Sequence, residues 1–254
     1  MKLGTTCRQY WFRGHPRTFD SLLPKVYREP FYSARPNIEF WAGQRFRMRA
    51  RSFAARVPDW GDHLAWLLMM QHCGVPTRLL DWTESMLVAL YFAAGDPSDE
   101  PGEVWCMNPT RLNWCSDCYI CMPDDPPIRY LAEEVFLEQK RLPKLAESLE
   151  LKNLPTRALA LIPPFELPRM AAQMSRFTMH PSPDGTSMIE FLLRSEKCLV
   201  RYTVPAASKA TLRKDLASLG VSHETLFHSL ESLAKTIKEE ICEKDYKLVD
   251  PPHF

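Results

Sequence analysis

Residues 69–94 read MMQHCGVPTRLLDWTESMLVALYFAA, and this stretch predicts two buried helices joined by a short strand. The first helix is apolar and ends at Gly74, with Pro76 just beyond it, which is the usual order at a helix C-terminus. The run Thr77–Leu80 then predicts a buried strand. The three elements together are expected to form the centre of the fold.

The second helix has an N-cap pattern at its start. Asp81 lies three residues before Glu84, the spacing of an N-cap and its reciprocal partner, and an apolar run follows at 87–92. Helix N-termini offer free backbone N–H groups to an anionic ligand, although Asp81 and Arg78 could equally pair for structural reasons. Both interpretations apply to the polar residues of this turn, Arg78, Asp81, Trp82, Thr83 and Ser85.

Composition indicates an ordinary globular protein of 254 residues, with 45% hydrophobic and 25% charged residues and a net charge of +1. This charge favours no class of partner. No apolar run reaches the roughly 20 residues that a membrane span needs, and the first residues lack the apolar core of a signal peptide. We therefore expect a cytoplasmic protein without membrane partners.

The eight cysteines are expected to be reduced thiols. Cys115, Cys118 and Cys121 have the spacing C-x-x-C-x-x-C, which can bind zinc or an iron–sulfur cluster. A second paired spacing is missing, so no metal site is predicted. These cysteines belong to a Cys/Pro-rich insertion at about 108–127.

Short strands and helices that do not alternate regularly predict an α+β fold in one domain, residues 1–254, with a C-terminal helical segment at about 206–247. Strands are also expected at 103–107, 159–162, 175–180, 188–193 and 199–204. The arginine-rich residues 28–56 fit a helix better than a strand. They could bind a nucleic acid backbone or form a solvated face.

Two further polar positions stand next to apolar segments. An aromatic, strand-like run at 9–14 ends in Arg13 and Gly14, and Arg13 is either a salt-bridge partner or a ligand-facing guanidinium. Arg169 and Gln173 lie four residues apart and share one face of a short helix. We predict that Arg13, Asp81, Thr83 and Gln173 converge on one cleft.

Three segments resemble the FRG domain family. Phe12-Arg13-Gly14 with His15 resembles its name-giving motif, and residues 69–93 resemble its longest signature. The helical end of the chain, with Leu212, Gly220 and Phe227, is similar to its C-terminal stretch. The departures are Cys73 in place of a histidine, Met86 in place of a proline, and the cysteine insertion.

The layout is also similar to that of ADP-ribosyltransferases, which implies a split, mixed β-sheet core with flanking helices. In those enzymes one strand ends in Arg-Gly, a second carries Ser or Thr before an apolar helix, and a third element supplies a glutamate. Here Arg13-Gly14 matches the first, residues 81–85 match the second, and the neutral Gln173 stands near the third. A carboxylate from Asp81, Glu84 or Glu190 would then replace the glutamate.

This resemblance implies NAD as the cofactor. Cleavage of its nicotinamide–ribose bond passes through an oxocarbenium-like state that requires polar anchors and a negative charge. Tyr10, Trp11 or Trp82 could stack on the nicotinamide ring. The implied catalytic residues are Arg13, Asp81, Thr83 and Gln173, and the implied NAD-binding residues are Gly14, His15, Arg78, Trp82, Ser85 and Arg169.

Two functions remain open. The first is an NAD-dependent ADP-ribosyltransferase, a toxin or phage-defence effector that modifies a protein or nucleic acid and has an antitoxin or regulator as a further partner. The second is a non-catalytic module that binds a nucleotide or nucleic acid in the same cleft.

Overall fold

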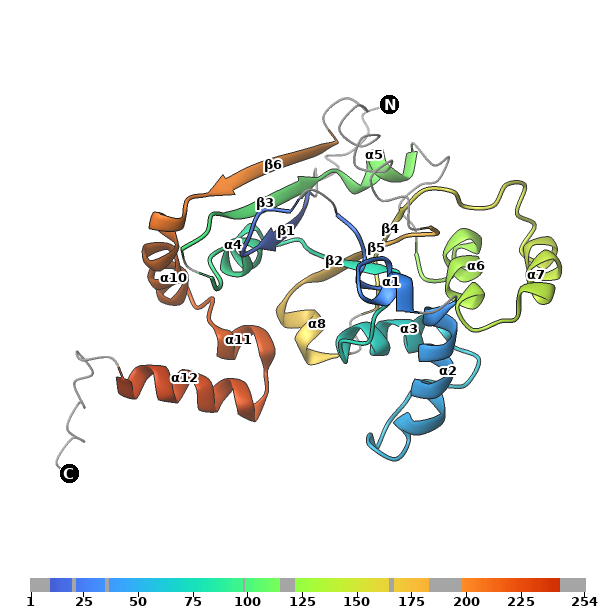
Figure 1. Cartoon of the computed structure of the whole chain (residues 1–254), viewed down its shortest axis with the longest axis horizontal. Coiled ribbons are helices and arrows are strands. Elements are labelled where there is room, and N and C mark those ends of the chain that lie inside the picture. The colour runs from blue at the N-terminus through green and yellow to red at the C-terminus, as the bar shows by residue number, and fades with distance from the viewer. Residues whose placement is uncertain are drawn as a thin grey trace, which may run out of the picture.

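A computed structural model describes residues 10–19, 22–34, 37–97, 99–114, 122–164, 167–182 and 198–242. The described strands form one sheet in the order β4-β5-β2-β1-β3-β6, with helices around it (Figure 1). The α+β class predicted from the sequence is confirmed. The strands are β1 (Trp11–His15), β2 (Leu79–Thr83), β3 (Gly102–Met107), β4 (Leu159–Leu161), β5 (Ser175–Met179) and β6 (Leu199–Val204).

Most of the described chain outside the sheet is helical. The α-helices are α1 (Phe31–Ala34), α2 (Ile38–Ala50), α3 (His63–His72), α4 (Met86–Ala93), α5 (Pro109–Trp114), α6 (Pro126–Glu134), α7 (Leu142–Ser148), α8 (Pro168–Ala172), α10 (Lys209–Ser218), α11 (His223–Phe227) and α12 (Leu230–Cys242). The 3-10 helices are η1 (Lys25–Tyr27), η2 (Gln139–Arg141) and η3 (Ala206–Ser208).

Each strand pairing among the described residues is antiparallel, so the expectation of a mixed sheet is wrong. The connection from β1 to β2 contains α1, α2 and α3, and a connection of that length can return the chain in either direction. Hydrophobic pattern does not fix this direction. The expectation of a mixed sheet came from the resemblance to ADP-ribosyltransferases.

The sheet is almost divided between β2 and β1. These two strands share a single residue pair, Phe12 with Thr83, whereas β2 and β5 pair over all five residues from Leu79 to Thr83. The sheet therefore has two three-stranded halves, β4-β5-β2 and β1-β3-β6, and β2 and β1 join them through this one residue pair. This split is where the candidate site lies.

The alternation of side chains along the strands separates the core into clusters. On one face, Leu79, Phe177 and Met179 pack with α3 and α6, and Val104 packs with α4. The opposite face buries a cluster that contains Trp11, Trp82 and Trp105. The first face is therefore covered by two separate groups of helices.

The central stretch differs from its prediction in two respects. The strand begins at Leu79 and not at Thr77, and it continues through Asp81 to Thr83 because these residues pair with β5. The N-cap of α4 is Ser85, whose hydroxyl accepts a hydrogen bond from the Val88 N–H at 3.3 Å. The expectation that Asp81 caps this helix is wrong.

Other predicted elements are found close to their expected positions. The helix within residues 28–56 is α2, and the strands expected at 103–107, 159–162, 175–180 and 199–204 are β3, β4, β5 and β6. Within the insertion, Pro109–Trp114 forms α5. The strand expected at 188–193 and the cysteines at 115, 118 and 121 lie outside the described residues.

Candidate active site

A pocket of about 260 Å³ lies where β1 and β2 diverge, on the sheet face shared by Phe12, Asp81 and Thr83. It is bounded by β1 and β2, by one residue of α3, by α4, and by α8 with the start of β5. The predicted convergence of Arg13, Asp81, Thr83 and Gln173 is confirmed, since all four line it. The complete lining is Phe12, Arg13, Gly14, Gln71, Asp81, Trp82, Thr83, Val88, Phe92, Arg169, Gln173 and Ser175.

Arg13 lies in the middle of β1 and not at its end. Its guanidinium donates to the backbone carbonyl of Asp81 at 2.6 Å, and its Nε donates to His15 Nε2 at 3.0 Å. Burial lowers the pKa of Arg13 to about 10, with Asp81 acting in the opposite direction, so the guanidinium is charged at neutral pH. Arg13 therefore links the two strands and presents a positive charge at the pocket.

Asp81 is the one acidic side chain among the described residues that line the pocket. Its carboxylate is 57% exposed, lies 3.7 Å from the Arg13 guanidinium, and accepts a hydrogen bond of 2.7 Å from the Gln71 amide. The Gln71 amide is fixed in turn, because its oxygen accepts a hydrogen bond from the Thr77 hydroxyl. The carboxylate is thus oriented but remains accessible to a ligand.

The Thr83 hydroxyl is buried and engaged at both its donor and acceptor sides. It donates to the Gln173 carbonyl at 2.7 Å and accepts from the Ser85 N–H at 3.0 Å. Ser85 in turn caps α4. The hydroxyl groups of Thr83 and Ser85 therefore stabilise the turn that joins β2 to α4.

Arg169 reaches the pocket from α8 and Gln173 from the C-cap of that helix, and the two side chains lie on the same side of it as their spacing predicted. The guanidinium carbon of Arg169 lies 4.5 Å from the centroid of the Phe227 ring. Burial lowers the pKa of Arg169, and Asp81 opposes this shift. The Gln173 amide donates to the Leu226 carbonyl at 3.2 Å.

Gly14 and His15 support the site in different ways. A Cβ at Gly14 would lie 1.8 Å from the Ala89 carbonyl oxygen, so this glycine allows β1 to pack directly on α4. His15 is buried, and burial lowers its pKa to about 2, with Arg13 adding to the shift. Its neutral ring can accept the hydrogen bond from Arg13.

Arg78 lies away from the pocket, contrary to the expectation that it contacts NAD. Its buried guanidinium binds Glu39 at 2.8 Å and Glu134 at 2.5 Å. Burial alone would lower the pKa of Arg78, but the two carboxylates outweigh it and raise the pKa. The structural interpretation of this arginine is correct, although its partners are Glu39 and Glu134 and not Asp81.

Trp82 and Trp11 are not available to stack on a ligand ring. Both are buried in the cluster on the opposite sheet face, and the Trp82 indole N–H donates to the Thr178 hydroxyl at 3.0 Å. Tyr10 is exposed but does not line the pocket. Phe12 and Phe92 supply the aromatic surface of the pocket instead.

Glu84 is also committed to the fold. Its carboxylate accepts from Arg176 at 2.8 and 2.9 Å, and both side chains are buried. Glu190, the third candidate, lies outside the described residues. Of the carboxylates considered as a substitute for a glutamate, Asp81 is the one that the structure places in the pocket.

Sequence reasoning missed Gln71, Phe12, Val88, Phe92 and Ser175 as pocket residues. Gln71 had a visible signal, since it is a polar residue in the apolar helix that opens residues 69–94. The apolar residues had none, because a side chain that lines a pocket has the same sequence pattern as one in the core.

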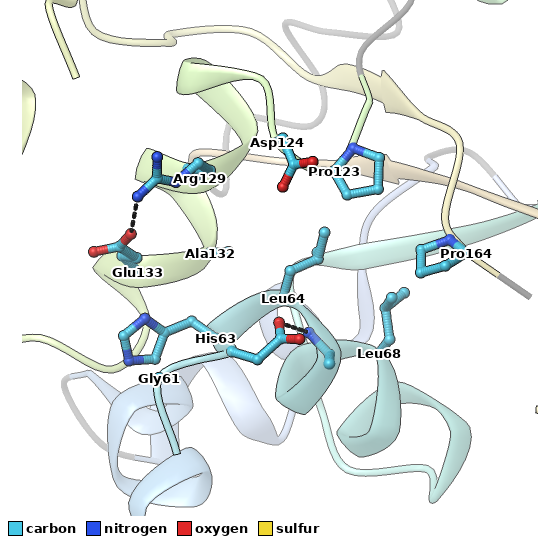
Figure 2. Close-up of a pocket in the computed structure, with 12 residues that line it drawn as sticks. Gly61, His63, Leu64, Leu68, Pro123, Asp124, Arg129, Ala132, Glu133 and Pro164 are labelled. Atoms are coloured by element: carbon cyan, nitrogen blue, oxygen red, sulfur yellow. Dashed lines mark hydrogen bonds and ion pairs between the residues drawn. The ribbon is translucent and has the colours of Figure 1, made fainter. Parts of the chain in front are cut away.

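A second cavity of about 380 Å³ lies between α3 and α6 (Figure 2). Some polar side chains of its wall bind one another or the backbone: Arg129 lies 3.6 Å from Glu133, and Asp62 accepts from the Ala65 N–H at 3.0 Å. It contains none of the predicted site residues. The smaller pocket at the split is the better candidate because all four residues predicted to converge on one cleft line it.

Among the described residues, no group of three or more His, Cys, Asp or Glu side chains is placed to hold a metal ion. No described helix is both long enough and apolar enough to span a membrane.

Comparison with known protein families matches residues 8–101 to the FRG domain. This range includes β1, β2 and α4, but not α8, so Arg169 and Gln173 complete the pocket from outside the matched stretch. No curated protein and no solved structure matches the chain.

Proposed function

The chain carries an FRG domain at residues 8–101, and from this premise we propose that its pocket binds NAD and transfers ADP-ribose to a protein or nucleic acid. The observation that carries the proposal is the position of Asp81. Its accessible carboxylate lies 3.7 Å from the Arg13 guanidinium, is oriented by the Gln71 amide, and lines a pocket that Arg169 also lines.

The residues present fit the chemical groups of NAD. Arg13 and Arg169 supply positive charge for a diphosphate, and guanidinium groups bind such oxygens well. Asp81 and Gln71 offer hydrogen-bonding groups for ribose hydroxyls. Phe12 and Phe92 provide an apolar surface for a ring.

The size of the pocket limits how much of NAD it can enclose. Pockets that hold drug-sized ligands have volumes of roughly 300–1,000 Å³. At about 260 Å³, this pocket can enclose one end of a dinucleotide, and the remainder would lie outside it. We assign the enclosed end to the nicotinamide and its ribose, because Asp81 lies there.

NAD would supply a glycosidic bond whose cleavage develops positive charge on the ribose. The Asp81 carboxylate is the group that can stabilise this charge. Gln71 holds the carboxylate in place, and preorganised charge of this kind lowers a barrier without reorganisation during the reaction. Gln173 is neutral and donates to the Leu226 carbonyl, so it acts as part of the pocket wall.

A second candidate is nucleotide binding without catalysis. It is favoured by the hydrogen bonds of two residues that the resemblance implied to be catalytic. The Thr83 hydroxyl and the Gln173 amide are both bound to protein groups and would have to exchange partners to act on a ligand. The role of toxin or phage-defence effector is a further proposal that depends on the transferase activity.

Calorimetric titration with NAD and with ADP-ribose, together with nicotinamide release measured by chromatography, distinguishes these functions. The transferase proposal expects NAD binding and nicotinamide release, both lost or strongly reduced in Arg169→Ala. Arg129→Ala, in the wall of the other cavity (Figure 2), is the matched control and should behave as wild type. Binding of NAD without release would favour the non-catalytic module, and absence of binding to NAD and to ADP-ribose would refute the transferase and any module that recognises these two nucleotides.

A further inference from the structure

Helix α11 does not line the pocket but packs against residues that do. Three pocket residues contact it: Arg169 lies over the Phe227 ring at 4.5 Å, the Gln173 amide donates to the Leu226 carbonyl at 3.2 Å, and the ring centroids of Phe92 and Phe227 are 6.2 Å apart. In Figure 1, α11 lies beside α8, below the sheet. This helix is outside the stretch matched to the FRG domain.

The local structure of α11 holds Phe227 in place. Ser222 and Thr225 form a capping box at its start, and Leu226 is buried. The His223 ring stacks on Phe227 at 4.4 Å, and His223 also interacts with the Tyr91 hydroxyl of α4 at 3.1 Å. The Phe227 ring is therefore fixed from both α4 and its own helix.

The Arg169 guanidinium lies against this ring. Within the part of the chain that the structure describes, the Phe227 ring is the direct contact of this side chain, and Asp81 and His72 interact with it electrostatically. A guanidinium over an aromatic face keeps its N–H groups available at its edge, which is the part that binds phosphate oxygens. Arg13, in contrast, uses its N–H groups on the Asp81 carbonyl and on His15.

We propose that Phe227 is a positioning residue that holds the Arg169 guanidinium at the pocket to bind a phosphate group of the ligand. The proposal rests on the proposed function only in identifying this phosphate with the diphosphate of NAD. It predicts that pyrophosphate alone binds the protein through Arg169, whether or not NAD is turned over.

The test measures pyrophosphate affinity of the full chain in wild type, Phe227→Leu, Phe227→Tyr, Arg169→Ala and the Phe227→Leu/Arg169→Ala double variant. Phe227→Leu should weaken binding roughly tenfold, a cation–π contribution of ordinary size, and Phe227→Tyr should retain affinity because its ring is kept. In the double variant, Phe227→Leu should add nothing to the loss caused by Arg169→Ala. Phe53→Leu, at a residue that is 87% exposed, is the control.

A second readout does not need a ligand. The Arg169 Nε–H resonance, assigned with Arg169→Lys, should carry a ring-current shift in wild type that disappears in Phe227→Leu. The proposal is overturned if wild type does not bind pyrophosphate, or if Phe227→Leu binds it as wild type does. Pyrophosphate binding with the expected variant pattern but without nicotinamide release would refute the transferase and leave this inference standing.

Discussion

Arg13 and the Asp81 carbonyl form a hydrogen bond of 2.6 Å that joins β1 to β2 beyond their single backbone pair. The two strands diverge here, and a side chain provides the link that a regular ladder would provide through backbone groups. The same divergence opens the pocket. Arg13 therefore contributes both to the continuity of the sheet and to the charge of the candidate site.

Arg13→Ala is expected to destabilise the protein as well as to impair ligand binding. Loss of a hydrogen bond from a charged group costs about 1.5–3 kcal/mol, and His15 would also lose its donor. Urea unfolding should show this loss, with a smaller one in Arg13→Lys, which keeps the charge and one donor. Unchanged stability in Arg13→Ala would mean that the link to Asp81 contributes little.

The Arg78 network should affect stability but not the pocket. Arg78→Met would leave Glu39 and Glu134 without their partner, and removal of one member of a buried ion pair costs about 3–5 kcal/mol. Arg129→Met, which removes a more exposed arginine from its pair with Glu133, should change stability by less than about 1 kcal/mol. Glu39→Gln, a milder change, should retain NAD affinity. A loss of NAD affinity in Glu39→Gln with the fold intact would contradict the structural role assigned to Arg78.

Acid should destabilise the protein partly through His15. Its folded pKa of about 2 lies far below the ordinary value of 6.5, so the unfolded chain binds the extra proton between these pH values. The stability that the neutral ring contributes is complete above pH 6.5 and is lost as the pH falls toward the folded pKa. The slope for this group is at most about 1.4 kcal/mol per pH unit.

Unfolding free energies of wild type and His15→Gln between pH 7 and pH 5 isolate this contribution. Glutamine keeps an acceptor for Arg13 but does not titrate, so the variant should lose less stability over this range. Parallel pH dependences of the two proteins would show that His15 is not held neutral by the fold. His180, whose pKa burial lowers to about 3, should contribute in the same direction in both proteins.

Gly14→Ala should disrupt the contact between β1 and α4. The added methyl would lie 1.8 Å from the Ala89 carbonyl oxygen, so the strand or the helix must move. We expect a loss of stability of about 1–3 kcal/mol or more, as in other overpacked cores, measured by urea unfolding. Gly61→Ala, where a Cβ would have no neighbour within 4 Å, is the matched control. Equal stabilities of the two variants would contradict the close packing.

The sequence was sufficient to predict the α+β class and the four residues that converge on the pocket. Residues of this kind can be recognised in the sequence because a polar residue between apolar runs lies where a buried helix or strand reaches the solvent. Local patterns did not identify which polar residues interact with each other. Arg78, Glu84 and Asp81 lie within one short stretch, yet the first two bind Glu134 and Arg176, which are 56 and 92 residues distant.

Local sequence patterns also did not determine the direction of the strands or the N-cap residue of α4. Asp81 and Ser85 are both good N-cap residues, and the pairing of β2 with β5 decides between them by keeping Asp81 in the strand. The role of Phe227 depends on contacts between α11, α8 and α4, which the sequence does not reveal. Long-range pairing therefore decided most of what the sequence left open.

Nicotinamide release from NAD by wild type, Asp81→Asn and Glu138→Gln measures whether the Asp81 carboxylate acts in catalysis. Asp81→Asn keeps the size of a side chain that is 57% exposed, so the fold should be retained while the negative charge is removed. If Asp81 stabilises the developing charge, wild type and Glu138→Gln, whose carboxylate pairs with Lys140 away from the pocket, should release nicotinamide, and Asp81→Asn should lose about 100-fold or more of this activity. No release by wild type, or equal release by Asp81→Asn, would contradict this role.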